Sequence, residues 1–412
     1  MGSKTISRSA IALCYCITFA LLLGISFTYG PIMTPDGDVL HKLAQVMNQS
    51  AFGSEDFEKE LANIKKYHSI NQPIGLYWGY LHVLSALDAL FGTRWYVAHL
   101  VMNALALSGT AIICLYAASA KFHSSLVTAT TWAAIVGCWE FIQWTTMTQS
   151  EPVFSFTLTL AVVLVLFGLC EARRSRMFLY FVTGLIMAVI SATLRPSGIP
   201  LVIFLSSFLV LLKIATQSHV KTSGDSLPVH TTTKIFLLAV PIMLLVGAGI
   251  LFDPSYLPGQ LLPKFLEYST FAKEGVIVLS RPWTYLQPGH DYWHFLAIVL
   301  TRFVYFFAFA DPSFSTFHNL INYVFYVPFY TLIVISMTAS FGTKRSSDMA
   351  FANLSLFLFS GVLVFATFHS ITLLDFDWRY RSSTHPMMAI IAAHGLYTTI
   401  QYRKRKSTAT DP

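Results

Sequence analysis

The chain has 412 residues, of which 55% are apolar and only 11% are charged, and its mean hydropathy is +0.59. An ordinary soluble domain carries roughly 25% charged residues, so this composition excludes a soluble globular protein and also a disordered chain. The 27 basic and 20 acidic residues give a formal net charge of +7. The Lys and Arg residues lie between apolar runs and not on one face, a pattern that indicates membrane topology and no nucleic-acid partner.

Long apolar runs recur from one end of the sequence to the other. A bilayer core of about 30 Å is crossed by about 20 helical residues, and backbone hydrogen bonds must be satisfied within it. The sequence therefore predicts an all-α polytopic membrane protein with about 10–12 membrane-spanning helices. The ten strong candidates are residues 9–29, 95–117, 125–145, 152–170, 177–194, 199–215, 235–252, 320–341, 350–374 and 384–401.

Two further runs, residues 73–92 and 294–310, are ambiguous because each carries ionisable residues. Each of them either spans the membrane or lies along its interface as an amphipathic helix. If neither spans, fifteen basic residues fall on the cytoplasmic side, and the short outer loops hold only Arg195, Arg379 and Arg381. The positive-inside rule therefore favours ten spans with both termini in the cytoplasm.

This topology predicts one integral membrane domain, residues 1–412. Its outer loops, residues 30–94 and 253–319, are expected to carry short interfacial helices, one of them at residues 55–66. A cytoplasmic loop over residues 216–234 and a cytoplasmic tail over residues 402–412 complete the arrangement.

Two acidic residues follow the first span in the sequence Thr34-Pro35-Asp36-Gly37-Asp38. A Pro-Asp-Gly turn would hold one carboxylate close to the outer membrane surface. The alternative is a turn aspartate followed by Asp38 as the N-cap of a helix over residues 39–48. Spacing alone does not decide which of the two carboxylates carries chemistry.

Two more charges lie at predicted outer span ends. Glu151 stands in Gln149-Ser150-Glu151-Pro152, directly before a span, where an ordinary helix start is the alternative interpretation. Arg195 is the lone cation between two long apolar spans, which indicates an anionic partner at that surface.

The densest cluster of ionisable residues is Asp375-Phe376-Asp377-Trp378-Arg379-Tyr380-Arg381, with His385 and the last span just after it. In an extended turn, Arg379 and Arg381 can both reach one phosphate, whereas the alternative is a loop closed by local salt bridges. No histidine or cysteine has metal-ligand spacing, so no metal site is predicted.

In chain order these motifs resemble those of the GT-C membrane glycosyltransferases, in the group related to protein O-mannosyltransferases and lipid A aminoarabinose transferases. The Asp36–Asp38 segment resembles the catalytic acidic position of the first outer loop, and Ser150-Glu151-Pro152 resembles the second acidic position. Leu194-Arg195-Pro196 resembles a recurrent Arg-Pro element, and Arg379-Tyr380-Arg381 resembles the R-Y…P element before the final span. The chain departs from the family in offering two aspartates for one position and in carrying no large soluble C-terminal domain.

The resemblance implies a GT-C-like bundle that transfers a sugar from a polyprenyl-phosphate donor on the outer face, normally with inversion. Asp36 or Asp38 would be the general base. The implied substrate-binding residues are Glu151, which would orient donor or acceptor, Arg195, Arg379 and Arg381, which would hold the phosphate, and Tyr380 and His385. The partners would be the polyprenyl-phosphate-sugar donor and a lipid, glycan or protein acceptor. No obligatory cofactor is expected, because the arginines can stabilise the phosphate charge, although an acidic cluster could also bind a divalent ion.

Two other classes remain as alternatives, a transporter or flippase of a lipid-linked or anionic solute and an O-antigen polymerase or ligase. Transporters usually place ionisable groups near the midplane and contain a repeat, whereas here the charges lie at span ends. A bacterial inner membrane is favoured over the endoplasmic reticulum, since the sequence has no retention motif.

Overall fold

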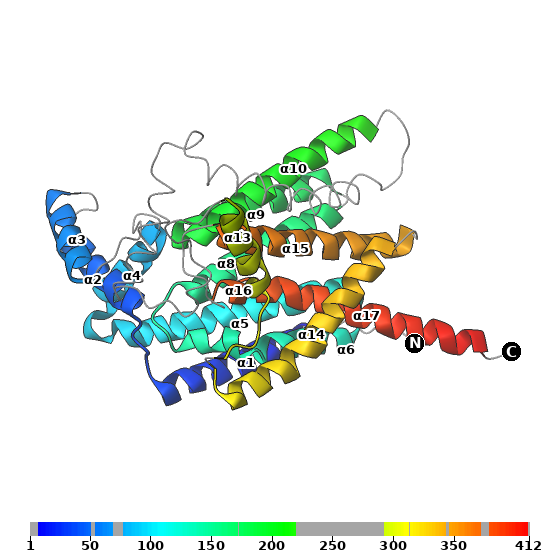
Figure 1. Cartoon of the computed structure of the whole chain (residues 1–412), viewed down its shortest axis with the longest axis horizontal. Coiled ribbons are helices and arrows are strands. Elements are labelled where there is room, and N and C mark those ends of the chain that lie inside the picture. Colours follow the sequence, from blue (N-terminus) through cyan, green and yellow to red (C-terminus); the bar gives the residue numbers. More distant parts are fainter. Residues whose placement is uncertain are drawn as a thin grey trace. The chain divides into compact units, whose positions relative to one another are not determined.

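The structure is a computed structural model, and it describes residues 7–50, 54–68, 77–171, 173–219, 292–312, 314–342, 346–371 and 379–410 (Figure 1). Within those ranges every regular element is a helix, and the β-type pairing is one isolated parallel bridge between Ile32 and Met147. The chain divides into two compact units, Met1–Val202 and Ile203–Pro412, here called unit 1 and unit 2.

The described residues confirm an all-α, multi-pass membrane protein. Six helical segments are long and apolar enough to cross a bilayer: Arg8–Tyr29, Trp78–Phe122, Glu151–Cys170, Arg174–Leu194, Thr316–Gly342 and Phe351–Ile371. A seventh candidate is the predicted span over residues 125–145, which is broken by a bend of 60°. The predicted span over residues 235–252 and most of the second outer loop lie outside the described residues.

Unit 1 contains the helices that carry the first half of the predicted site. Their bounds are α1 Arg8–Tyr29, α2 Pro35–Gln49, α3 Glu55–His68, α4 Trp78–Phe91, α5 Trp95–Phe122, α6 Ser125–Val136, α7 Trp139–Ile142, α8 Glu151–Cys170 and α9 Arg174–Leu194, with 3-10 turns η2 Gly92–Arg94, η3 Gln143–Thr145 and η4 Pro196–Gly198. Helix α5 packs against α1, α6 and α8, and α8 packs along α9. Helix α10, Ile199–His219, begins in unit 1 and continues into unit 2.

The ambiguous run over residues 73–92 contains α4, which has only 14 residues. At 1.5 Å per residue this helix is about 21 Å long, shorter than a bilayer core of about 30 Å. Helix α4 leads through the short turn η2 directly into α5, and together they extend over 45 residues. Gly92 separates the two helices, because its φ and ψ of 51° and −128° lie outside the helical region. The other ambiguous run contains α13, with 15 described residues.

The first helix of the outer loop begins earlier than the sequence predicted. Helix α2 begins at Pro35, so Asp36 and Asp38 both lie in its first turn. Its N-cap is Thr34 and not Asp38, because the Thr34 hydroxyl accepts a hydrogen bond from the Gly37 amide at 3.0 Å. Proline suits the first helical position, where its fixed φ fits and its missing N–H costs nothing. The expected Pro-Asp-Gly turn is therefore a capped helix start, and the helix predicted at residues 55–66 is α3.

Helix α2 is held in unit 1 by one apolar face. Val39, Leu40, Leu43 and Ala44, at the spacing of a helix face, are buried against α3, α4 and α5. Burying one Val or Leu side chain away from water contributes about 1.5–3 kcal/mol. The exposed pair formed by Asp38 and Lys42 contributes a few tenths of a kcal/mol at most. Apolar packing therefore decides where α2 and its acidic first turn lie.

Unit 2 contains α13 Tyr292–Phe306, α14 Thr316–Gly342, α15 Ser346–Ile371, α16 Arg379–Ser382 and α17 His385–Thr410. Helix α14 packs against α15 and α17, and α15 also packs against α13 and α17. A buried polar contact joins three of these helices, since the hydroxyls of Ser336 and Ser355 lie 2.9 and 2.8 Å from Nδ1 of His394. The predicted span over residues 384–401 lies in α17. This helix is not one of the six candidate spans given above, because it is less apolar than they are.

Replacing Gly395 with alanine should destabilise unit 2. A Cβ atom at Gly395 would lie only 1.9 Å from the Leu332 carbonyl oxygen, so α17 and α14 would have to move apart. Overpacking of this kind typically costs about 1–3 kcal/mol. We expect a lower unfolding temperature for Gly395→Ala in detergent, measured by intrinsic fluorescence. Gly342→Ala is the matched control, because nothing lies within 4 Å of a Cβ there. Equal behaviour of the two variants would contradict this close helix contact.

Candidate active site

The acidic first turn of α2 lies where the connector after α1 meets a distant loop of unit 1. Ile32 donates from its amide to the Thr146 carbonyl at 2.7 Å and accepts from the Thr148 amide at 3.2 Å. Gly37 packs so tightly there that a Cβ atom would lie 2.1 Å from the Thr148 carbonyl oxygen. A glycine is therefore needed between Asp36 and Asp38 for the helix to approach this loop.

The two carboxylates of this turn have different surroundings. Asp38 forms an ion pair with Lys42 one turn later, with Oδ2 and Nζ 2.6 Å apart, and both side chains are about a third to a half exposed. Asp36 is partly buried. Both carboxylates follow the end of α1 by a few residues, as the sequence predicted, and either can meet a ligand at this surface.

Glu151 and Arg195 form a buried ion pair. Glu151 begins α8 and Arg195 follows the last residue of α9, so the packing of α8 along α9 brings the two side chains together. The Arg195 guanidinium donates through Nη1 to Oε1 of Glu151, and Arg195 and Glu151 are only 7% and 2% exposed. The anion that the sequence predicted beside Arg195 is therefore, within this structure, the carboxylate of Glu151.

The local sequence explains how Arg195 reaches this position. Proline disfavours helical conformation in the residue before it, and Arg195, which precedes Pro196, has extended φ and ψ of −159° and 138°. Gly198 then allows the chain to pass close to α9, since a Cβ there would lie 2.5 Å from the Ala192 amide nitrogen. Arg195 is thus fixed at the end of α9 by the residues that follow it.

A hydrogen-bonded bridge connects the ion pair to the start of α2. The Gln149 amide is assigned with its nitrogen toward Glu151, because this orientation pairs its donors with acceptors and its oxygen with a donor. In it the amide donates to the two carboxylate oxygens at 2.9 and 3.0 Å. Its oxygen accepts from the Thr34 hydroxyl at 3.0 Å, and that hydroxyl also caps α2. Unit 1 therefore brings together three of the predicted positions: the Asp36–Asp38 turn, Glu151 and Arg195.

Aromatic and polar side chains of α4 and α5 form the buried wall beside the ion pair. Tyr80 is buried in the same cluster as Leu194, the residue that precedes Arg195. The Tyr80 hydroxyl is hydrogen-bonded to Nε2 of His99 at 2.7 Å. Asn103, one turn after His99, donates to the Met147 carbonyl at 3.0 Å and so fixes the loop that precedes Glu151.

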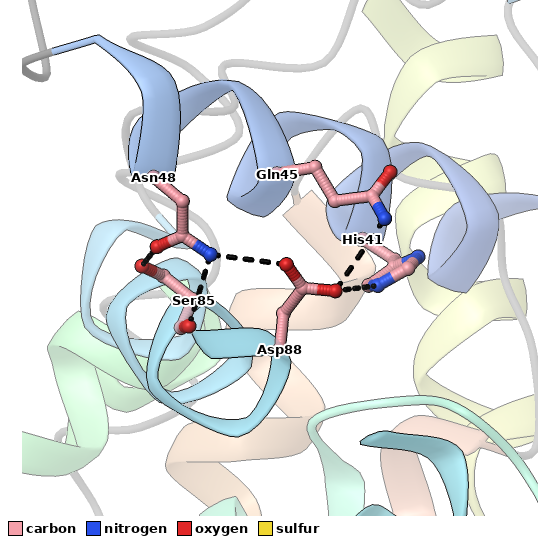
Figure 2. A network of polar contacts seen from close by, with 5 residues as sticks. All are labelled: His41, Gln45, Asn48, Ser85 and Asp88. Carbon is pink, nitrogen blue, oxygen red and sulfur yellow. Dashed lines mark hydrogen bonds and ion pairs between the residues drawn. The ribbon is translucent and has the colours of Figure 1, made fainter. Parts of the chain in front are cut away.

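A second polar network holds α2 against α4. Figure 2 shows three side chains of α2 converging on Asp88 of α4. His41 and Gln45 lie 3.1 and 3.4 Å from its Oδ1, and Asn48 donates to Oδ2 at 3.0 Å. Sequence reasoning did not assign these residues, although the spacing 41, 45 and 48 marks one helix face and Asp88 is acidic within an apolar run. It also left Thr34, Gln149 and Tyr80 without a role.

The remaining predicted residues lie in unit 2, three of them in the short helix α16 and His385 at the start of α17. The Arg379–Arg381 segment is therefore helical and not the extended turn that the sequence allowed. Arg381 is buried, donates through Nη1 to the Ala308 carbonyl, and lies over the ring of Tyr326 with 4.6 Å to its centroid. Tyr380 stacks on His369 at 4.1 Å, and His385 stacks on Phe329 at 4.9 Å. The side chain of Arg379 and the two acidic residues Asp375 and Asp377 lie outside the described residues.

Across the described ranges, no group of three or more His, Cys, Asp or Glu side chains is arranged to hold a metal ion. No protein-family model matches the sequence, and no significantly similar protein was found among curated sequences or solved structures. A function for this chain is therefore inferred from its residues and from their geometry.

A double-mutant cycle tests the coupling between Glu151 and Arg195. Glu151→Gln leaves a buried cation and Arg195→Met leaves a buried carboxylate, and breaking a buried pair in this way typically costs about 3–5 kcal/mol. The double variant removes both charges, so we expect it to be less destabilised than the sum of the single variants. The measurement is the thermal unfolding of the full-length protein in detergent. Strict additivity of the two effects would show that the pair is not coupled.

Proposed function

We propose that this protein is a membrane glycosyltransferase of the GT-C type. It transfers a sugar from a polyprenyl-phosphate donor to an acceptor hydroxyl on the non-cytoplasmic face of its membrane. The observation that supports the proposal is the bridge from the buried Glu151–Arg195 pair, through Gln149 and Thr34, to the acidic first turn of α2. This bridge joins the partly exposed carboxylates of Asp36 and Asp38, the proposed proton acceptors, to the buried guanidinium of Arg195.

The proposed reaction uses the two groups in different roles. An acceptor hydroxyl attacks the anomeric carbon of the donor sugar while Asp36 or Asp38 takes its proton. The bond between the anomeric carbon and the phosphate oxygen breaks, and polyprenyl phosphate leaves with the bonding electron pair. Attack on the side opposite the leaving group inverts the anomeric carbon. Negative charge then increases on the phosphate, where a guanidinium stabilises it.

Glu151 has a positioning role in this proposal. Its carboxylate accepts from Arg195 and from Gln149, so it sets the orientation of the guanidinium plane. A guanidinium has five N–H donors in a rigid fork, and one of them is directed at Glu151. Preorganised donors of this kind need no rearrangement when charge develops in the transition state.

The phosphate-binding role of Arg379, Tyr380, Arg381 and His385 is a second part of the proposal. Arg381 and His385 have aromatic neighbours in unit 2, and aromatic faces suit the isoprenoid carbons that adjoin a lipid phosphate. The acceptor is a lipid, a glycan or a protein, and a bacterial inner membrane is the proposed location.

Substituting the acidic residues of α2 tests the general base. Asp36→Asn, Asp38→Asn and the double variant keep the shape of the turn and remove its proton acceptors. We expect loss of the base to lower transfer by about 100-fold or more. The measurement is release of polyprenyl phosphate from a panel of polyprenyl-phosphate sugars, in proteoliposomes supplied with a membrane extract as acceptor.

Asp56→Asn is the matched control for this experiment, since Asp56 is an exposed acid in the first turn of α3, in the same outer loop. It should retain full transfer. Full transfer by the Asp36/Asp38 double variant would exclude both residues as the base. If the wild type releases no polyprenyl phosphate with any donor, transport of lipid-linked or anionic solutes becomes the better hypothesis.

Binding of the lipid phosphate is measured separately from chemistry. We expect native mass spectra of the wild type to show saturable binding of polyprenyl phosphate, and Arg379→Ala to weaken it severalfold because a charge-assisted contact is lost. Arg176→Ala is the control, an exposed arginine in the first turn of α9 that the predicted topology places in the cytoplasm. Equal binding by wild type and Arg379→Ala would remove Arg379 from the proposed site.

A further inference from the structure

A cavity of about 190 Å³ lies between α14, α15 and the C-terminal half of α17, within unit 2. Its buried member is His394, and Tyr402 and Arg405 are exposed at the surface. The cavity therefore leads from the surface to a polar group inside the helix bundle. The lining residues are Ala339, Phe351, His394, Tyr397, Thr398, Gln401, Tyr402 and Arg405.

The walls of the cavity combine aromatic rings with hydrogen-bonding groups. Phe351 and Tyr397 pack with their ring centroids 5.4 Å apart. The His394 ring is fixed in place because Nδ1 is engaged by the hydroxyls of Ser336 and Ser355. Thr398 and Gln401 add polar side chains between the aromatic wall and the surface. Such a lining suits a ligand with an apolar stem and a polar head.

The charge around the cavity favours an anion. Four consecutive basic residues, Arg403 to Lys406, lie on α17. Among the three helices that line the cavity, α14 and α17 contain no acidic residue and α15 contains one, Asp348. The C-terminal end of a helix carries only about half a negative charge, which four cations outweigh. An arginine guanidinium matches the geometry of a phosphate group. Basic clusters of this size next to a membrane span bind anionic lipids.

The exposed end of the cavity, at Arg405, is distant from the residues assigned to sugar transfer in unit 2. Twenty residues of α17 separate His385 from Arg405, which corresponds to about 30 Å of helix, or one bilayer core. The positive-inside rule assigns the end with four basic residues to the cytoplasm. The lipid surface nearest to Arg405 is then the cytoplasmic leaflet.

We propose that this cavity binds the phosphate headgroup of an anionic phospholipid from the cytoplasmic leaflet. Arg405 contacts the phosphate, Thr398 and Gln401 contact the polar head, and the glycerol and first acyl carbons lie against Phe351 and Tyr397. The site is independent of the proposed glycosyl transfer, since it shares none of the residues assigned to that reaction.

Two neighbouring arginines give a matched pair of variants. Arg403 and Arg405 belong to the same exposed basic run, and only Arg405 lines the cavity. Native mass spectra of the full-length protein would be recorded with phosphatidylglycerol and with phosphatidylcholine of the same acyl chains. We expect the wild type to retain phosphatidylglycerol preferentially. Arg405→Gln should weaken its binding by about fivefold, and Arg403→Gln should change it less than twofold.

The same measurement separates the cavity from a diffuse basic surface and from a site for soluble phosphate. Equal losses in Arg403→Gln and Arg405→Gln would show a diffuse basic surface and overturn the cavity site. Displacement of the lipid by millimolar inorganic phosphate would assign the site to soluble phosphate and overturn the lipid assignment. Gln401→Leu keeps all four charges and removes a polar group of the cavity, so it should lower phosphatidylglycerol binding if the cavity is occupied. Unchanged binding by both Gln401→Leu and Arg405→Gln would refute the proposal.

Discussion

Glu151 and Arg195 are buried against each other where α8 begins and α9 ends. Removing an ion from water costs several kcal/mol even after relaxation, so such a pair persists only when both partners are held in good geometry and the remaining polar atoms are satisfied. Here Gln149 satisfies the carboxylate and Pro196 sets the backbone of Arg195. The ion pair therefore forms only when three segments have all reached their folded conformation: the start of α8, the end of α9 and the loop before Glu151.

The same constraint extends to the acidic turn of α2. Thr34 caps this helix and also meets Gln149, so the connector after α1 is positioned by the polar groups that surround the ion pair. The Asp88 network adds an independent attachment between α2 and α4. The helix turn that carries the partly exposed carboxylates of Asp36 and Asp38 is thus attached to unit 1 from two sides.

Apolar runs in the sequence predict most of the helices, because period and length are local properties. Residues 9–29, 152–170 and 177–194 correspond to α1, α8 and α9 almost residue for residue. The sequence also predicted a site at Asp36 or Asp38, Glu151 and Arg195, since charged residues at span ends usually face a wet cavity or a partner. It did not reveal that Glu151 and Arg195 pair with each other or that His41 meets Asp88, because these contacts join residues 44 and 47 positions apart. The break after Val136 was missed for another reason. A glycine within an apolar run is compatible with either a straight or a bent helix.

The pairing of the connector after α1 with the loop before α8 bears on the order in which the chain assembles. The Thr34 amide meets the Thr148 hydroxyl across 114 residues of sequence, and ribosomes add roughly 5–20 residues per second. The Thr34 cap on Gly37 is local and can form as soon as α2 emerges. Its long-range partners are synthesised on the order of 10 s later. During that interval the local cap of α2 can form, whereas the hydrogen bond that joins Thr34 to the loop before α8 is still missing.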